Sequence, residues 1–324
     1  MRKMMKKEKR RMKEGENMSQ ITQSKRRVGK LNMNKTFPYL LIAPTVILIA
    51  AFMIYPICRV FYLSFQNYDL TNIFKNGFAG LNNFKELFTE DELFWDSAWI
   101  TLKWVLSQVV FQLIFGMIVA LILNQKFKGR GFARAISLVP WAVSGVLVTM
   151  LWTLMYDQSS GLINDILIKT GLISEKVAWL ADKNTFFPAV IIAELWRGIP
   201  FFAINLLAGL QSIPGDVYES SAIDGCGPMK NFIYITLPYL KDSIIFATLL
   251  RGIWEFNSID MIFTMTNGGP MNKTTTLPIY MMKTAIIKGN YGYGSAIGVV
   301  AFLFLLVFAI LYIKMSGYGG DDNE

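Results

Sequence analysis

Residues 218–238 read YESSAIDGCGPMKNFIYITLP, a polar stretch between two of the most apolar parts of the chain. Just before it, Asp216 stands three residues ahead of Glu219, a pattern typical of a capping box at the start of a helix. Gly225 is the residue type that most often ends a helix, because glycine reaches left-handed backbone angles without strain. The 218–238 segment is therefore predicted to begin with a short helix that stops at Gly225.

A second short helix is predicted after a turn at Gly227 and Pro228, and Pro238 is expected to end it. One side of this second helix is apolar and contains Met229, Phe232, Ile233 and Ile235. Two short helices of this kind have no hydrophobic core of their own. We therefore expect the 218–238 segment to dock on another protein surface.

The composition places the rest of the chain in a membrane. Hydrophobic residues make up 53% of the sequence and charged residues only 17%, which is more apolar than an ordinary soluble domain. Six apolar runs reach the roughly 20 residues that a helix needs to cross a bilayer. The six predicted spans are 37–64, 99–123, 135–156, 186–210, 243–264 and 295–313.

The distribution of basic residues indicates the orientation of these spans, since lysine and arginine collect in short cytoplasmic loops. The tail before residue 37 is basic, and the loop 125–134 carries lysines and arginines without one acid. The loop 66–98 carries six acids against two lysines. We therefore place both termini in the cytoplasm, together with the 218–238 segment.

The predicted fold is all-α and integral to the membrane, with six transmembrane helices, cytoplasmic N and C termini, and a cytoplasmic helix between spans 4 and 5. Residues 1–36 are expected to form a basic, disordered cytoplasmic tail. Residues 37–315 form the transmembrane domain, in which the loop 211–241 contains the cytoplasmic helix, and residues 316–324 form a short cytoplasmic tail. The predicted location is the plasma (cytoplasmic) membrane, as a multi-pass protein.

Residue types that the sequence lacks exclude several chemistries. Without a histidine, the chain has no HExxH metal site and no histidine proton relay. It has no GxxxxGK[ST] loop for a nucleotide, so the energy for any work must come from another protein. Cys58 and Cys226 are predicted on opposite sides of the membrane and therefore cannot pair. We expect no metal and no cofactor on this chain, and we attribute its net charge of +9 to topology and anionic lipid rather than to nucleic acid.

Four of the ionisable residues inside predicted spans stand out, because such a residue costs roughly 2.5–3.5 kcal/mol to insert and by default marks a site. Glu194 and Arg197 lie on the fourth span, and Arg251 and Glu255 lie on the fifth. Helical geometry places each pair on one face, about 12–18 Å below the outer boundary. A cavity lined by arginine donors and carboxylate acceptors suits sugar hydroxyls. The alternative is an ion-pair network that only orients the two helices.

Two mid-span sequences indicate irregular backbone. Gly198 and Pro200 can open the fourth span only where the freed carbonyl faces protein or a cavity. The sequence VPWAVSG at 139–145 has a similar effect in the third span. Its Trp141 can stack on a sugar ring or, as an alternative, pack in the interior.

The 218–238 segment and four further motifs follow the order of a known family. The segment is similar to that family's EAA motif, from Glu219 through Gly225 to Pro238. The further motifs are LVPWAVSG at 138–145, NGGP at 267–270, TTTLP at 274–278 and YGSA at 293–296. Together they resemble the permease subunits of binding-protein-dependent ABC importers, in the carbohydrate-uptake class of MalF-like sugar permeases. The resemblance covers about 37–313.

The resemblance implies that the first helix of the 218–238 segment is a coupling helix, which inserts into a cleft of a cytosolic ATPase. The residues that match the coupling motif are Glu219, Ser220, Ser221, Ala222, Asp224 and Gly225. Ser220 and Ser221 stand where the family usually has alanines. Serine is small enough to preserve docking, so we expect these two residues to tune the fit to the partner.

The resemblance also implies a substrate pocket on the third, fourth and fifth spans. The matching positions are Trp141, Gly145, Glu194, Arg197, Gly198, Arg251, Glu255 and Ser258. The implied partners are a second permease subunit in a heterodimer, a cytosolic ABC ATPase dimer that binds ATP and Mg, an extracytoplasmic sugar-binding protein, the carbohydrate itself and membrane lipid. This chain would then be a transport subunit for a sugar or oligosaccharide rather than an enzyme.

Other classes explain less of the sequence. An ion-coupled secondary transporter of a polar solute can use Glu194 or Glu255 to carry protons, but it leaves the 218–238 segment without a role. A membrane enzyme needs a catalytic constellation, and no nucleophile and base are visible as a pair. An assembly subunit without a pocket leaves the mid-membrane charges unexplained.

Overall fold

The computed structural model describes residues 33–317 of the chain. These residues are mainly helical, as predicted, and the chain divides into two units, Met1–Arg59 and Val60–Glu324. Four of the described helices are long and apolar enough to cross a membrane, and two bent helix pairs bring the number to six if each pair is one span. The predicted tails at 1–36 and 316–324 lie almost wholly outside the described residues.

The first candidate span, Phe37–Ser64, is helical throughout. α2 (Met33–Ile49) continues through the π-helical turn η1 (Ala50–Ile54) into α3 (Tyr55–Ser64). The π turn comes just before Pro56, a residue without an N–H for a regular helical hydrogen bond.

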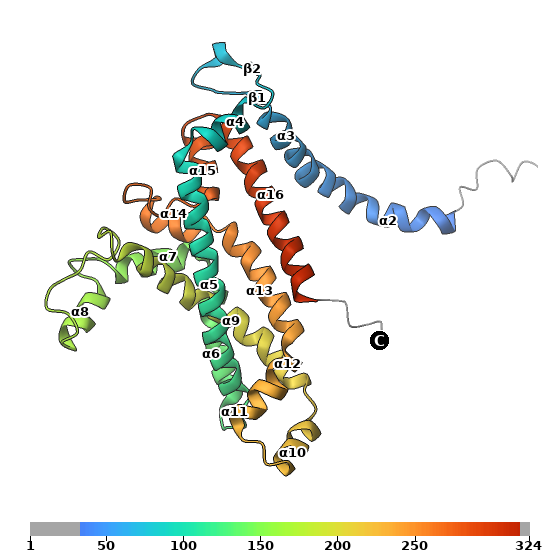
Figure 1. Ribbon diagram of the computed structural model, residues 1–324, viewed down its shortest axis with the longest axis vertical. Helices are drawn as coiled ribbons and strands as arrows, with labels where there is room; N and C mark the ends of the chain where they lie inside the picture. The colour runs from blue at the N-terminus through green and yellow to red at the C-terminus, as the bar shows by residue number, and fades with distance from the viewer. Residues whose placement is uncertain (1–32, 318–324) are drawn as a thin grey trace, which may run out of the picture. The chain divides into compact units, whose positions relative to one another are not determined.

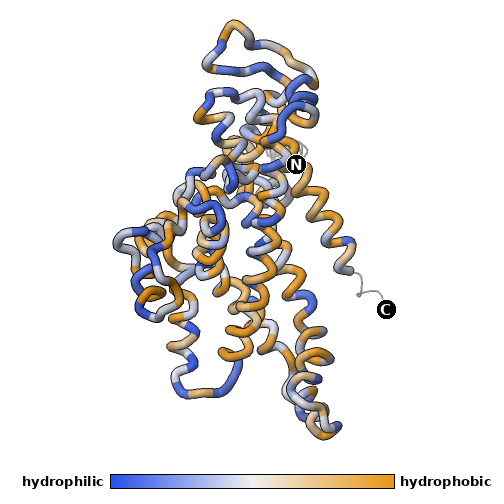
Figure 2. Tube along the Cα trace, turned by 60° about the vertical axis from the view of Figure 1, so that its left-hand side comes forward, coloured by the Kyte–Doolittle hydropathy of each residue, from blue (hydrophilic) through white to orange (hydrophobic). Residues whose placement is uncertain are grey.

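The second unit is a helical bundle built around α5 (Glu92–Asn124), against which α9 (Phe186–Ser212) and α13 (Lys241–Phe256) pack, with α16 (Tyr291–Ser316) against α13 (Figure 1). Hydrophobic residues follow the length of these helices, and hydrophilic residues gather in the loops at their ends (Figure 2). α5 and α9 approach closely at Gly116, where an added Cβ would lie 2.4 Å from the Phe202 Cβ. Only glycine at this position permits that approach.

The third predicted span is broken in two. α6 (Arg130–Ala142) and α7 (Gly145–Met155) meet at an angle of 90°. Val143 and Ser144 between them have ψ angles of 139° and 137°, which no helix accommodates. The irregular backbone predicted at 139–145 is therefore confirmed, and the predicted span over 135–156 consists of two helices that meet at this break.

The fourth predicted span behaves differently, because α9 runs through Gly198 and Pro200 without a break. The fifth predicted span, in contrast, ends early. α13 stops at Phe256, and a separate helix, α14 (Asp260–Thr266), follows after a short turn. This turn matters because it brings polar residues to the site described below.

Short elements cover the end of the bundle where α5 begins. They are the antiparallel strands β1 (Gln66–Asn67) and β2 (Gly77–Phe78), the 3-10 turn η2 (Ile73–Lys75), α4 (Asn82–Thr89), α15 (Leu277–Met282) and the π turn η4 (Lys283–Ile287). α8 (Leu162–Lys169) lies at the side of the bundle, next to α7 (Figure 1). Asp91 fastens three helices at the end where α5 begins. Its Oδ1 accepts the Phe94 N–H of α5 at 3.0 Å, and its Oδ2 accepts the hydroxyls of Tyr280 at 2.5 Å and Tyr293 at 2.6 Å.

Candidate functional site

A buried network of charged side chains joins α9 to α13. Arg251 Nη2 lies 2.8 Å from Glu194 Oε1 on α9 and 2.6 Å from Glu255 Oε1, one turn along α13. Arg197 Nη1 lies 3.4 Å from the other Glu194 oxygen, Oε2. Glu194, Arg251 and Glu255 are buried, whereas the Arg197 side chain is 29% exposed. The four charges predicted from their spacing therefore meet in one network, which we call the charge network.

α5 supplies polar partners to the charge network. Trp104 Nε1 donates to Glu255 Oε2 at 3.0 Å, and Gln112 Nε2 donates to Glu255 Oε1 at 3.1 Å. Gln112 also donates to Gln108 Oε1 at 2.9 Å, and Gln108 donates to the Ile191 carbonyl of α9 at 3.3 Å. Trp104 was not predicted to belong to the site. The signal was its spacing, because positions 104, 108 and 112 recur every four residues on one helix face.

Two glycines among the predicted substrate residues make room for this network. A Cβ added at Gly198 would lie 2.3 Å from the Gln112 side-chain amide. A Cβ added at Gly145 would lie 3.4 Å from Arg197 Cζ. Both glycines therefore shape the site by leaving space for a neighbouring polar side chain.

A cavity of about 330 Å³ opens beside the charge network. Six of the eight predicted substrate residues line it: Trp141, Glu194, Arg197, Arg251, Glu255 and Ser258. Four residues that the sequence analysis did not name also line it: Trp254, Asn257, Ile259 and Asp260. Asn257 and Ile259 lie on the turn between α13 and α14, and Asp260 begins α14; the prediction of a continuous fifth span had hidden this turn.

The groups that a ligand would meet in this cavity differ from the predicted ones. Every oxygen of the two network carboxylates already faces an arginine, amide or indole donor of the chain. The more accessible groups are the Arg197 guanidinium, the Asn257 amide, the Asp260 carboxylate and the indole rings of Trp141 and Trp254. Such a mixture of donors, acceptors and aromatic faces suits a polyhydroxylated ligand.

The 218–238 segment begins inside α10 (Gly215–Ile223). The N–H of Gly225 donates to the Ala222 carbonyl at 3.1 Å, and the N–H of Cys226 donates to the Ser221 carbonyl at 3.0 Å. These two bonds form a Schellman motif, for which Gly225 supplies a φ of 75°. The prediction that Gly225 ends the first helix is therefore confirmed.

The predicted start of this helix is wrong. α10 already begins at Gly215, so Asp216 lies inside its first turn, and no side chain caps the helix. The capping-box pattern failed because Pro214, with extended backbone, occupies the capping position. The acidic Asp216 still lies where the helix dipole favours a negative charge.

The second half of the segment starts as predicted and ends later. α11 (Pro228–Asn231) has Pro228 in its first turn, and it continues through the π turn η3 (Phe232–Thr236) into α12 (Leu237–Tyr239). Pro238 lies inside α12 and does not end the helix. Because Pro238 lies within the first turn after the π turn, its missing N–H is accommodated there.

Side-chain contacts inside the segment explain one of its two serines. Ser221 is buried, and its hydroxyl donates to the Asn231 side-chain oxygen on α11. The Tyr218 hydroxyl bonds to Thr236 Oγ1 at 2.9 Å. Ser220 is exposed. Ser221 therefore fastens α10 to α11, a bond that alanine cannot make, while Ser220 lies on the outer surface.

The outer surface of the 218–238 segment is apolar in part and uncovered by the described residues. Ile223 is 88% exposed, Met229 71% and Tyr234 75%. Glu219, Ser220, Ala222, Asp224 and Gly225 are exposed as well. Five of the six residues that match the coupling motif are thus open to a partner, and the sixth, Ser221, faces inward.

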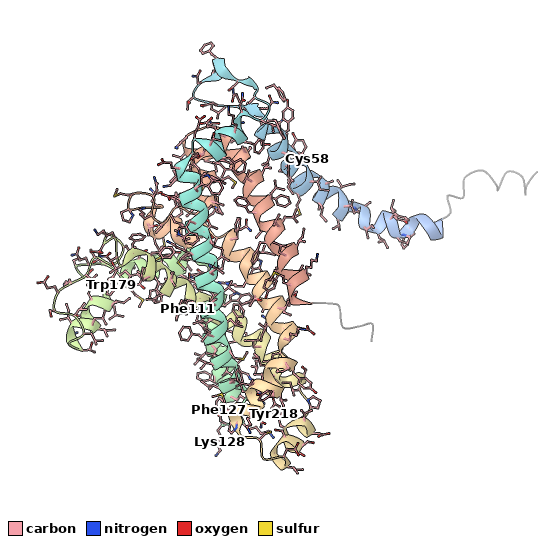
Figure 3. The ribbon with its side chains drawn as sticks, in the orientation of Figure 1. Cys58, Phe111, Phe127, Lys128, Trp179 and Tyr218 are labelled. Carbon is pink, nitrogen blue, oxygen red and sulfur yellow. The ribbon has the colours of Figure 1, made fainter. Side chains whose placement is uncertain are left out.

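The segment links the two helices that carry the charge network, since α9 ends at Ser212 and α13 begins at Lys241. Tyr218 lies at the same end of the bundle as Lys128 of the basic 125–134 loop (Figure 3). That arrangement agrees with the prediction that both lie on one side of the membrane.

Comparison with known proteins decides the family. Residues 112–315 match the model of the binding-protein-dependent transport system inner membrane component. The chain belongs to this family. Its members are membrane permeases of transport systems, so the resemblance seen in the sequence is confirmed.

Two relatives have names that refer to sugars. The trehalose/maltose transport system permease protein MalF of Thermococcus litoralis is 39% identical over 87% of this chain and 94% of its own. The sulfoquinovosyl glycerol transport system permease protein SmoG of Agrobacterium fabrum is 34% identical over 85% of this chain and 89% of its own. This permease also shares the fold of a chain in the crystal structure of a bacterial alginate ABC transporter, with a TM-score of 0.75 at 23% identity over 88% of this chain and 96% of the other.

Proposed function

We propose that this permease translocates a sugar or oligosaccharide, delivered by an extracytoplasmic binding protein, as one membrane subunit of an ATP-driven importer. A separate cytosolic ATPase dimer, which binds ATP and Mg, would hydrolyse the nucleotide. The observation that carries this proposal is the connection of α9 and α13. Both helices line the 330 Å³ cavity. The connection from the end of α9 to the start of α13 contains the exposed 218–238 segment.

The segment has the properties of a coupling element. An ATPase that moves α10 would move the ends of α9 and α13 with it, because Ser221 and Tyr218 fasten α10 to the helix that leads into α13. Glu219, Ala222 and Asp224 then offer charged and small contacts on the docking surface. Gly225 fixes the direction of the turn between the two halves.

In the cavity, we assign direct sugar contacts to the accessible groups. Arg197, Asn257, Ser258 and Asp260 would exchange hydrogen bonds with hydroxyls, and Trp141 with Trp254 would stack on sugar rings. We assign Glu194, Arg251 and Glu255 the role of positioning Arg197 and the two helices. Three carboxylates face two guanidiniums in this lining, so the net charge is 2 − 3 = −1 and a neutral sugar fits better than an acidic one.

A second permease subunit would close the cavity. Trp141 is 48% exposed and Trp254 43%, and exposed apolar side chains continue along α6 and α7. A partner of the same family would cover this side in a heterodimer. The alternative of an ion-coupled carrier is not favoured, because the carboxylates that would carry protons are already engaged by donors within the chain.

The test is reconstitution of the permease with its associated subunits in proteoliposomes, followed by ATP hydrolysis across a panel of sugars with the binding protein present. We expect one sugar class to stimulate hydrolysis, and we expect Trp254→Ala to raise the sugar concentration at half-maximal stimulation. Uptake that persists without ATP and collapses with an ionophore would overturn the proposal in favour of ion coupling.

A further inference from the structure

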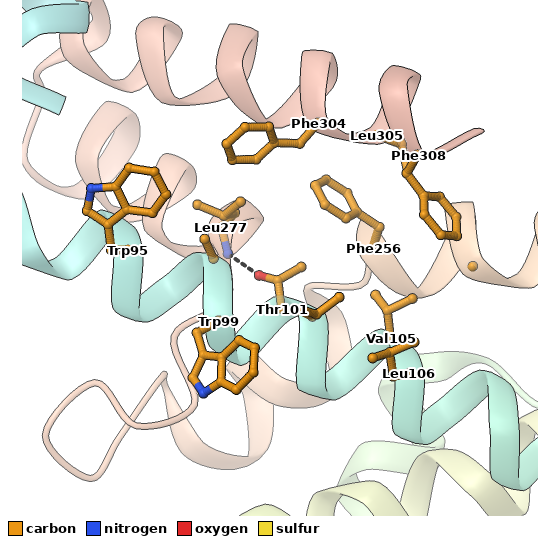
Figure 4. A pocket seen from close by; sticks show the side chains of 13 residues that line it. Trp95, Trp99, Thr101, Val105, Leu106, Phe256, Leu277, Phe304, Leu305 and Phe308 are labelled. Atoms are coloured by element: carbon orange, nitrogen blue, oxygen red, sulfur yellow. Dashed lines mark hydrogen bonds between the residues drawn. The ribbon is translucent and has the colours of Figure 1, made fainter. Parts of the chain in front are cut away.

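An apolar groove of about 370 Å³ lies between α5, α13, α15 and α16 (Figure 4). Aromatic side chains form much of its wall: Trp95, Trp99, Phe256, Phe304 and Phe308. The polar side chain in the wall is Thr101, and its hydroxyl already accepts the Leu277 N–H at 2.8 Å and donates to the Ser97 carbonyl at 2.7 Å. Apart from the indole N–H groups of Trp95 and Trp99, the wall therefore offers a ligand only apolar contacts, which suit a hydrocarbon chain.

A basic cavity of about 410 Å³ lies next to this groove. Lys103 of α5, Lys183 from the loop before α9 and Lys273 from the loop before α15 line it, and Asp96 is the acid among its lining residues. The net charge of the lining is thus 3 − 1 = +2. All three lysines are exposed, and none forms an ion pair with a carboxylate of residues 33–317. An anionic group would satisfy all three.

Trp99 connects the two cavities, because it lines both. Lys103 Nζ lies over the Trp99 ring, 5.1 Å from its centroid, so the lysine side chain points back toward the start of α5. Tryptophans concentrate at the level of lipid headgroups, and lysines below that level extend toward it. The basic cavity is therefore at headgroup depth, and the groove continues from it into the apolar part of the bundle.

We propose that the two cavities together bind one anionic glycerophospholipid, at the end of the bundle opposite the 218–238 segment. The phosphate and headgroup bind Lys103, Lys183 and Lys273, and one acyl chain fills the groove behind Trp99. The net charge of +2 selects an anionic headgroup over a zwitterionic one, whose own cation would lie beside the lysines. A lipid fits better than a protein partner because the basic cavity opens into an apolar groove. The proposed lipid site requires that the chain lies in a membrane, but it does not depend on which solute the permease transports.

The test measures lipid binding to the purified full chain in a polyoxyethylene detergent by native mass spectrometry. Dioleoyl phosphatidylglycerol and dioleoyl phosphatidylcholine are titrated separately. We expect the first phosphatidylglycerol to bind at least about fivefold more tightly than phosphatidylcholine. K103Q/K183Q/K273Q should abolish this preference, whereas the matched control K85Q/K169Q/K176Q, which removes the same charge from exposed lysines outside the cavity, should retain it.

The groove is tested separately with Gly252→Leu. A Cβ at Gly252 meets only ordinary contacts, 3.7 Å to Phe308 and 4.0 Å to Val109, so a larger side chain enters the groove without a backbone clash. This variant should weaken both lipids about equally, and Leu102→Trp, which fills the groove from α5, should do the same. Matching elution in size exclusion confirms that each variant is folded.

Three results would overturn the proposal. The first is an unchanged lipid preference in K103Q/K183Q/K273Q, or the same loss in the control variant. The second is unchanged affinity for both lipids in both groove variants. The third is a K103Q/K183Q/K273Q variant that keeps its lipid preference but binds the purified extracytoplasmic binding protein more weakly than the unaltered chain does. That result would assign the lysines to a protein partner.

Discussion

In the charge network, the oxygens of Glu194 and Glu255 accept hydrogen bonds from within the chain, whereas Ile223, Met229 and Tyr234 of the 218–238 segment face outward. The buried charges have been removed from water and are compensated internally, as low-dielectric surroundings require. The apolar side chains of the segment contribute no burial free energy until a partner covers them. The carboxylates at the centre of the chain are thus paired internally, whereas the apolar surface of the 218–238 segment is not covered by the described residues. This difference predicts that substitutions in the charge network lower stability, whereas substitutions in the 218–238 segment impair coupling.

The largest expected effect is at the centre of the network. Arg251→Met leaves Glu194 and Glu255 buried without their shared cation, which should cost about 3–5 kcal/mol of stability. The measurement is thermal unfolding of the purified chain in detergent or nanodiscs. Arg197→Met, at the partly exposed arginine, should cost much less.

Replacing the whole network separates folding from transport. The triple variant E194Q/R251M/E255Q removes all buried charge and should recover most of the stability that Arg251→Met loses. If the triple variant is as unstable as Arg251→Met, the loss is one of packing and the electrostatic account is wrong.

The next effect concerns the space that the network occupies. Gly198→Ala places a Cβ 2.3 Å from the Gln112 amide, so that amide must leave Glu255. We expect a loss of about 1–3 kcal/mol, typical of overpacking, in the same unfolding assay. Gly131→Ala is the matched control, because a Cβ at that helical position meets nothing within 4 Å.

Changes in the exposed segment should leave folding intact and affect coupling. Gly225→Asp forces a non-glycine residue into a φ of 75°, which costs about 1–2 kcal/mol locally and redirects the turn. We expect normal insertion and at least about tenfold lower sugar-stimulated ATP hydrolysis, equivalent to about 1.4 kcal/mol. Gly225→Asn should be milder, since asparagine tolerates left-handed angles. Normal stimulation in Gly225→Asp would contradict the coupling role.

The smallest effect distinguishes the two serines. Ser221→Ala removes the bond to Asn231 and leaves a partly buried acceptor without this donor, for a loss of about 1 kcal/mol. Ser220→Ala should not change stability measurably. The measurement is hydrogen exchange of the α10 and α11 amides in both variants. Equal protection in the two variants would show that the hydrogen bond of Ser221 does not stabilise the segment.

Local patterns in the sequence predicted what depends on neighbours along the chain. Gly225 ends α10 because only its own backbone angles are involved, and Glu194 pairs with Arg197 because helical spacing brings them together. Trp104 and Asn257 were not predicted. The first finds its acceptor on another helix, 151 residues away in sequence, and the second depends on the turn that follows α13. The predicted end at Pro238 missed by one residue, because the helix continues through a π turn to Tyr239 before the chain bends by 65°.

The contact of Gly116 with Phe202 has a practical consequence for following the transport cycle. Because α5 and α9 pack closely at this point, sliding of one past the other is opposed, and we expect the two helices to move together. A pair of spectroscopic labels on these two helices should record a constant distance throughout turnover and so would serve as the reference pair. Labels that report motion belong on α6 and α13, next to the 90° and 65° bends, where we expect the helices to change their relative angle.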